Sequence, residues 1–157
     1  FSPQAIANFC WAVGRLSATT KIGSPANSDG AAVVIGALMT AAAREALSRI
    51  SMFTWQDLSG VLVALGHGRY RSPEALSLST ALLSRAAHSS HSLSFQVMLN
   101  IALSALRLGV PQETVQPLVS AIAGCVSARS SRLNDNDKRQ WADLQRQCQA
   151  EPMKVAH

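Results

Sequence analysis

The sequence predicts an all-α protein, a short α-solenoid of about three helical hairpin repeats followed by a C-terminal helix. Hydrophobic residues make up 48% of the 157 residues and aromatic residues only 5%. Ala, Leu and Ser dominate, and such small residues suit closely packed helices better than a β-sandwich. Apolar residues recur at helical spacing, and one helix-start pattern returns three times. Stacked hairpins explain all of these features.

Three segments align and define the repeat. They read FSPQAIANFCWAVGRL from residue 1, FTWQDLSGVLVALGHG from residue 53 and LSFQVMLNIALSALRL from residue 93, so the copies start 52 and 40 residues apart. A hydroxyl residue takes the second place in each copy, at Ser2, Thr54 and Ser94, where it is expected to cap the helix. We expect core positions at Ile6, Phe9 and Val13 in the first copy, Leu58, Val61 and Leu65 in the second, and Met98, Ile101 and Ala105 in the third.

A second helix is expected in each copy. The first would run from Asp29 to Ile50, and the other two would open at Pro73 and Pro111, where a missing N–H costs nothing. A last helix would begin at a capping Asn134 and pass through Trp141. The predicted units are therefore repeat 1 at 1–52 with an inserted loop at 21–28, repeat 2 at 53–92, repeat 3 at 93–128, and a linker, terminal helix and tail at 129–157.

The first helix carries a more specific motif, P-Q-A-I-A-N-F-C-W-A-V-G-R-L at 3–16. It resembles the first helix of the octotricopeptide repeats, and of the related repeats in FAST-kinase-like and RAP-domain proteins, which commonly reads P-Q-x-L-x-N-x-x-W-A-x-x-x-L. The later copies keep the pattern in part, because Gly60 and Val63 replace its Asn and Trp. The resemblance covers most of the chain to Ala128. The matching residues are Pro3, Gln4, Ile6, Asn8, Trp11, Ala12 and Leu16.

The resemblance implies a setting and a function. Proteins of this family act mainly in mitochondria and plastids, on organellar transcripts or rRNA, and some belong to mitochondrial ribosomes or RNA-processing assemblies. We therefore expect an RNA-binding repeat protein, or a fragment of one, in a ribonucleoprotein assembly of the mitochondrial matrix, with a plastid as the alternative location. Its expected partners are RNA and other proteins of a large assembly. The alternative function is a protein–protein scaffold subunit with no direct RNA contact.

Two aligned columns are the candidate binding residues. Eleven of the 14 basic residues are Arg, and guanidinium can bind two phosphate oxygens at once. Arg15, His67 and Arg107 align in the three copies, either as donors to successive phosphates or bases or as cations favoured by helix C-termini. Asn8 and Asn100 align with each other, and we expect them to bond a neighbouring repeat's backbone, with base reading as the alternative. The other candidate RNA-binding residues are Arg69, Arg71, Arg129 and Arg132.

No pattern predicts an enzyme, a metal site or a cofactor. The three cysteines are odd in number and lack a C-x-x-C spacing, which argues against a disulfide framework or zinc. His88 and His91 have no Cys, Asp or Glu near them in sequence to complete a metal site, and no phosphate-binding glycine loop or G-x-S-x-G occurs. The three Trp residues are expected to serve packing rather than base stacking.

No membrane partner is expected either. The apolar stretch Ala31–Ala43 is too short to span a bilayer, and no run of about 18 apolar residues lacks a charge. Because the chain starts at Phe1 rather than Met, we expect a processed form or a fragment.

Overall fold

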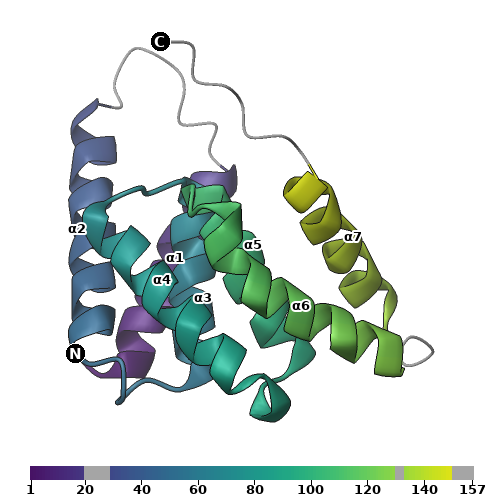
Figure 1. The fold of residues 1–157 in the computed structure, drawn as a ribbon. Helices are drawn as coiled ribbons and strands as arrows, with labels where there is room; N and C mark the ends of the chain where they lie inside the picture. Colours follow the sequence, from purple (N-terminus) through teal and green to yellow (C-terminus); the bar gives the residue numbers. More distant parts are fainter. Residues whose placement is uncertain (20–28, 130–132, 150–157) are drawn as a thin grey trace.

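The computed structural model describes residues 1–19, 29–129 and 133–149 (Figure 1). These residues form α-helices and one short 3-10 turn, and they contain no strand, which confirms the all-α class. The predicted insert at 21–28, Arg132 and the tail lie outside the described residues. The helices are α1 (Pro3–Thr19), α2 (Asp29–Ser48), α3 (Trp55–Gly68), α4 (Pro73–His88), α5 (Phe95–Leu108), α6 (Gln112–Arg129) and α7 (Asp135–Gln149), with the turn η1 at Ser90–Ser92.

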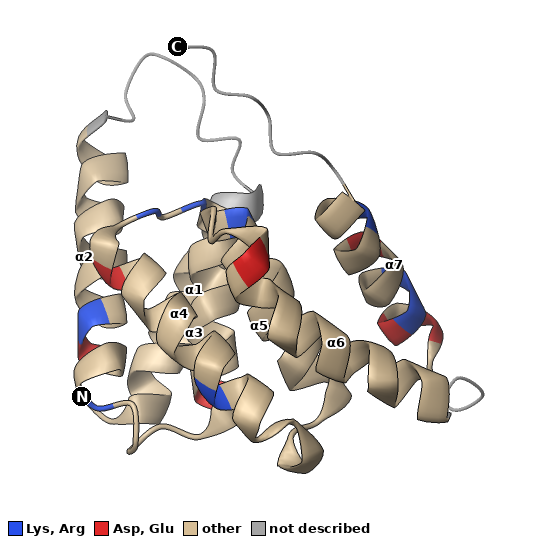
Figure 2. Ribbon diagram, in the orientation of Figure 1, with Lys and Arg blue, Asp and Glu red and all other residues tan. Residues whose placement is uncertain are grey.

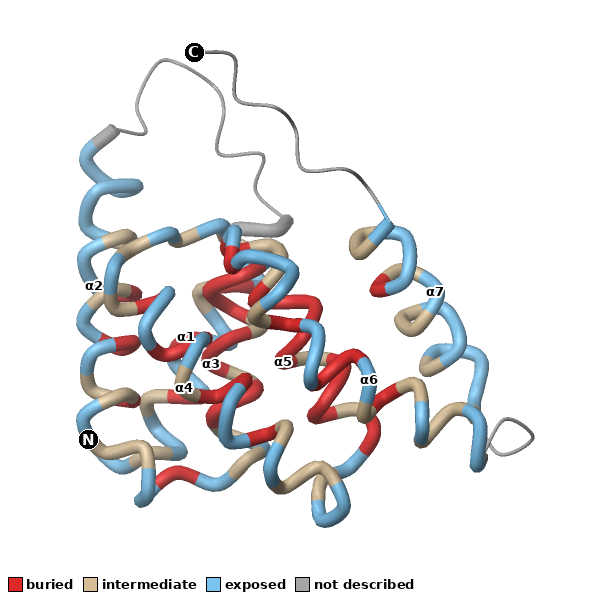
Figure 3. Tube along the Cα trace, in the orientation of Figure 1, coloured by how far each residue is buried: buried red, intermediate tan, exposed pale blue. Residues whose placement is uncertain are grey.

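The helices pack in two rows. In one row α1 lies against α3, α3 against α5, and α5 against α7. In the other row α2 lies against α4, and α4 against α6. Figure 3 shows burial concentrated where the two rows meet, with α3 and α5 buried most heavily and the outer sides of α2 and α7 exposed. The apolar core therefore runs between the rows.

Side-chain caps start the helices as the sequence predicts. The hydroxyl oxygens of Ser2, Thr54 and Ser94 each accept a bond from the backbone N–H three residues on, at 3.1, 3.1 and 3.2 Å. The backbone N–H of Thr54 in turn donates to Oδ2 of Asp57 at 3.3 Å, which completes a capping box. Asn134 caps α7 in the same way at 2.8 Å. These local signals place the helix starts without help from tertiary packing.

The predicted core is confirmed in two copies and wrong in part of the first. The core positions expected in the second and third copies are all buried. In α1, Phe9 is instead 42% exposed, and Ala7 and Cys10 face the core. Ile6 and Val13 are half-buried beside it. The reason is position in the row, because among the described residues α3 and α5 each have a row neighbour on both sides, whereas α1 has one only on the α3 side.

Small residues let successive helices of one row approach closely. A Cβ on Gly14 would lie 2.9 Å from the Cα of Ala64, and a Cβ on Gly66 would lie 3.1 Å from the Cα of Ser104. Gly14 and Gly66 occupy the same place in the aligned copies, and so do Ala64 and Ser104. The α1–α3 and α3–α5 interfaces therefore repeat one contact in one register.

One helix, α2, is apolar enough from Gly30 to Ser48 to cross a membrane by length and composition alone. The same helix packs on α4 in this fold. Met39 and Ala43 of α2 are buried, and Arg44 forms a 2.6 Å ion pair with Glu74 of α4. Core helices and signal sequences also have this length and composition, so the absence of a membrane span stays a prediction.

Candidate functional site

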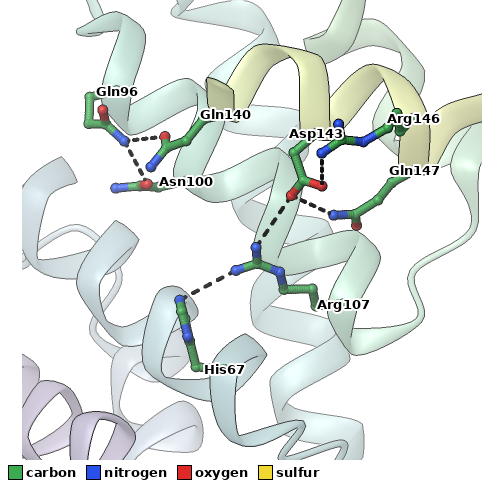
Figure 4. Close-up of polar contacts among 8 residues, drawn as sticks. All are labelled: His67, Gln96, Asn100, Arg107, Gln140, Asp143, Arg146 and Gln147. Atoms are coloured by element: carbon green, nitrogen blue, oxygen red, sulfur yellow. Dashed lines mark hydrogen bonds and ion pairs between the residues drawn. The ribbon is translucent and has the colours of Figure 1, made fainter. Parts of the chain in front are cut away.

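A polar groove of about 420 Å³ opens across α3, α5 and α7 (Figure 4). We call it the α3–α5–α7 groove. It brings two residues of a predicted column, His67 and Arg107, together with α7, a helix that lies outside the three aligned copies. Its polar lining residues are His67 from α3, Asn100, Ser104 and Arg107 from α5, and Arg139, Gln140, Asp143 and Arg146 from α7.

A chain of polar contacts crosses the groove from α3 to α7. The Nη1 of Arg107 lies 3.3 Å from the Nε2 of His67, and its Nη2 lies 3.6 Å from Oδ2 of Asp143. Asp143 also accepts bonds from Arg146 at 3.3 Å and from Gln147 at 2.9 Å. Arg107 is thereby held between His67 of α3 and Asp143 of α7, as Figure 4 shows.

His67 acts in this chain as a neutral acceptor. Partial burial of the ring, which stays solvent-exposed on one side, and then the charge of Arg107 lower the pKa of His67 below its ordinary value of 6.5. At pH 7 the ring is therefore uncharged, and its unprotonated Nε2 can accept a bond from the guanidinium. The aligned column does bring His67 and Arg107 together, but only Arg107 contributes a positive charge.

Three amides form a second polar cluster at the groove. The Nε2 of Gln96 donates to Oδ1 of Asn100 at 2.9 Å and to Oε1 of Gln140 at 2.6 Å. The expectation that Asn100 bonds a neighbouring repeat's backbone is therefore wrong, because its oxygen is taken by a side chain one turn earlier on its own helix. Its counterpart Asn8 is exposed on α1. The NH2 groups of Asn100 and Gln140 make no further bond among the described residues and are available as donors.

The groove carries an excess of positive charge. Arg107, Arg139 and Arg146 line it together with one carboxylate, that of Asp143, which leaves two positive charges over when His67 is neutral. Figure 2 shows that α7 carries a dense cluster of charged residues. Ser104 also lines the groove, and its Oγ is buried and has no hydrogen-bond partner among the described residues. The arrangement offers guanidinium and amide donors to an anionic, polar ligand.

The remaining predicted residues fall outside the groove. Arg15 is exposed on α1, with its guanidinium 5.3 Å from the ring centre of Trp11. Arg71 supports the site from behind, because its Nη2 donates to the backbone oxygen of Arg107 at 3.2 Å. Arg69 is exposed and ends α3 in a left-handed conformation, with φ of 51°. Arg129 is the last residue of α6, and its side chain lies outside the described residues, as does the whole of Arg132.

The tryptophans have different surroundings. Trp55 and Trp141 are half-buried against the core, as expected of packing residues. Trp11 is 56% exposed, so its packing role is a wrong prediction. Like Phe9, it points away from the core on a helix that has, in the part of the chain that the structure describes, a row neighbour on one side only.

Sequence reasoning missed every groove residue on α7. No column could have found Arg139, Gln140 or Asp143, because α7 was not aligned with the three copies. For the amide cluster one local signal was present on α5, since Gln96 and Asn100 are four residues apart and must share a helix face.

Other reactive groups have simple structural explanations. Burial raises the pKa of the Cys10 thiol to about 11, so this thiol is protonated and unreactive at neutral pH. The residues that the structure describes contain no group of three or more His, Cys, Asp or Glu placed to hold a metal ion.

Comparisons with protein-family models, with curated proteins and with solved structures returned no match. The resemblance to octotricopeptide-type repeats therefore stays a prediction from the motif in the first helix.

Proposed function

We propose that this protein is an RNA-binding α-solenoid of helical hairpin repeats and that single-stranded RNA binds in the α3–α5–α7 groove. The observation that carries the proposal is the groove itself, where three guanidinium groups and two amide NH2 groups converge from neighbouring helices of one row. The repeated glycine contacts of Gly14 and Gly66 support a solenoid, because they give two interfaces the same register.

The chemistry of the lining matches the two parts of a nucleotide. Guanidinium groups bind phosphate oxygens and can stack on exposed bases. The amide groups of Asn100 and Gln140 can donate to base edges, which single-stranded RNA leaves accessible. Arg107 is held by His67 and Asp143, so little side-chain freedom remains to be lost when a ligand arrives.

The resemblance of the first helix to organellar repeat proteins supports a location. We propose that the protein belongs to a mitochondrial ribonucleoprotein assembly, such as a mitochondrial ribosome or an RNA-processing complex, and that it has no enzymatic activity. Expression of the tagged protein in its native cells, followed by fractionation and RNA cross-linking, tests the location and the RNA contact together.

The groove proposal has a direct binding test. Arg107→Ala combined with Arg139→Ala removes two groove guanidinium groups. Binding of a fluorescent single-stranded RNA should weaken, and the slope of log affinity against log salt should fall by about 1.4 if each side chain neutralises one phosphate. The matched control is Arg44→Ala combined with Arg49→Ala, which removes two charges from the α2 side. Equal losses in both double variants would mean that RNA binding does not use the groove.

A scaffold function is the second candidate, and the ion pair between Arg107 and Asp143 favours it. A guanidinium already 3.6 Å from a carboxylate has less charge to offer a phosphate. If the unaltered protein bound no RNA at low salt, while circular dichroism showed it folded, the scaffold function would replace RNA binding.

A further inference from the structure

The outer side of α1 and α2 carries an apolar groove of about 530 Å³. Phe9 and Leu38 line it and remain 42% and 46% exposed. Farther along the same two helices, Leu16 and Val34 are more exposed still. We call this surface the α1–α2 face. It comprises the exposed neighbours Ala12, Leu16 and Val34 and the groove residues, of which only Glu45 is charged: Phe1, Ala5, Ile6, Phe9, Leu38, Ala41, Ala42 and Glu45.

The internal repeat indicates what such a face normally contacts. Phe9 aligns with Val61 in the second copy and with Ile101 in the third. Val61 and Ile101 are completely buried. They lie on the stripes of α3 and α5 that face the preceding helix of the row, because Ala64 and Ser104 on those stripes meet Gly14 and Gly66. The equivalent stripe on α1 has no helix against it among the described residues.

The small residue at the point where successive row helices cross is also present on α1. Ala12 aligns with Ala64 and Ser104, the two small residues that receive a glycine from the preceding helix. Ala12 is exposed and small, so a helix could approach it as closely as Gly14 approaches Ala64. A large residue there would prevent that approach.

A second copy of this chain does not fit the face in a head-to-tail arrangement. The α3–α4 hairpin of a second copy lies inside its own rows. Among the described helices the row ends at α7, whose exposed residues include Lys138, Arg139, Gln145 and Arg146. Placing these charges on Phe9 and Leu38 would bury them without partners.

We propose that the α1–α2 face docks a helical hairpin of the α3–α4 type that is not part of residues 1–157. The first helix of that hairpin packs on α1 with a glycine over Ala12, as α3 packs on α5 with Gly66 over Ser104. Its second helix packs on α2, as α4 packs on α6. The inference follows from the repeated register and does not depend on RNA binding.

The chain supplies a probe for this surface. A second copy of 53–92 is fused directly before Phe1 of the full chain, so that residue 92 precedes Phe1 as it precedes the aligned Leu93. The fusion should unfold in one cooperative transition, several degrees above the midpoint of the unfused chain. Two separate transitions, with the second at the unfused midpoint, would overturn the proposal.

Two substitutions test the crossing point. Ala12→Glu should leave the unfused chain nearly unchanged, because this position is exposed, but it should abolish the gain in the fusion. Gly66→Leu in the added copy alone should have the same effect. If both variants kept the full gain, the added hairpin would not be packing in the proposed register.

If the fusion unfolds irreversibly, cysteine labelling tests the docking instead. Ala12→Cys should react with a maleimide in the unfused chain and be protected in the fusion, with the site read by peptide mass spectrometry. Equal reaction rates would contradict docking. Self-association of the unfused chain that Phe9→Glu abolishes, or binding to phospholipid vesicles that Leu38→Glu abolishes, would assign the face to a second copy or to a membrane and overturn the proposal.

Discussion

Gly14 lies so close to Ala64 that a Cβ on it would fall 2.9 Å from the Ala64 Cα, a distance that real side chains avoid. The contact joins α1 to α3 through backbone rather than through flexible side chains. Because Gly66 and Ser104 make the equivalent contact between α3 and α5, the spacing of the row depends on small residues at one repeated position.

Gly14→Ala should therefore destabilise the protein, although alanine favours helices. The added methyl would push α1 away from α3, and overpacking of this kind costs about 1–3 kcal/mol, which exceeds the gain in helix propensity of about 0.5–1 kcal/mol. Gly60→Ala in α3 is the matched control, because a Cβ there meets nothing within 4 Å. Urea unfolding should show a loss for Gly14→Ala and a small gain for Gly60→Ala. A gain in both variants would contradict the close approach.

Leu58→Ala and Phe9→Ala should differ sharply in stability. Leu58 is 1% exposed in the core, and its truncation should lower the free energy of unfolding by about 2–5 kcal/mol. Phe9 lies on the α1–α2 face, so its truncation should cost about 1 kcal/mol or less. Chemical unfolding of both variants measures the difference. Similar losses would mean that Phe9 is covered in the isolated protein.

His67 should make stability depend on pH in the acidic range. Because its pKa is lowered in the folded protein, the unfolded chain binds more protons as pH falls below about 6.5. The stability contributed by the neutral ring is complete above that value and is lost as pH falls through the folded pKa. Unfolding at about pH 7.5 and about pH 5 should show a smaller drop for His67→Gln than for the control His88→Gln. An equal drop in both would place the titration elsewhere.

Arg15→Ala should affect RNA binding less than Arg107→Ala does. Arg15 aligns with Arg107 but is held near Trp11 and does not line the groove. The salt slope should flatten by about 0.7 for Arg107→Ala, if it neutralises one phosphate, and stay nearly unchanged for Arg15→Ala. Anisotropy titrations over a range of salt concentrations measure both slopes. Equal flattening would extend the RNA path along the whole aligned column to α1.

The sequence was sufficient to predict contacts between residues that are close to each other in the chain. Ser2, Thr54 and Ser94 cap helices three residues away, and such local bonds need no knowledge of the fold. Periodicity also found the buried stripe around Leu58. It failed for Phe9, because a helical pattern identifies an apolar face without showing whether another helix covers it.

The site was harder to predict because its contacts join distant parts of the chain. The bond between Gln96 and Gln140 spans 44 residues, and Arg107 meets Asp143 on a helix that no aligned copy includes. A column can suggest that His67 and Arg107 are neighbours. It cannot show that His67 is neutral, because the burial and charge that lower its pKa exist only in the folded protein.

The two ends of the helix row differ in character, with consequences for polymerisation. Head-to-tail growth into a filament requires each end to match the opposite end of another copy. Here one end exposes Phe9 and Leu38, and the other exposes Lys138, Arg139 and Arg146 of α7. Such unlike ends do not match, so a hairpin that docks on α1 lengthens the row without starting a fibre of identical subunits.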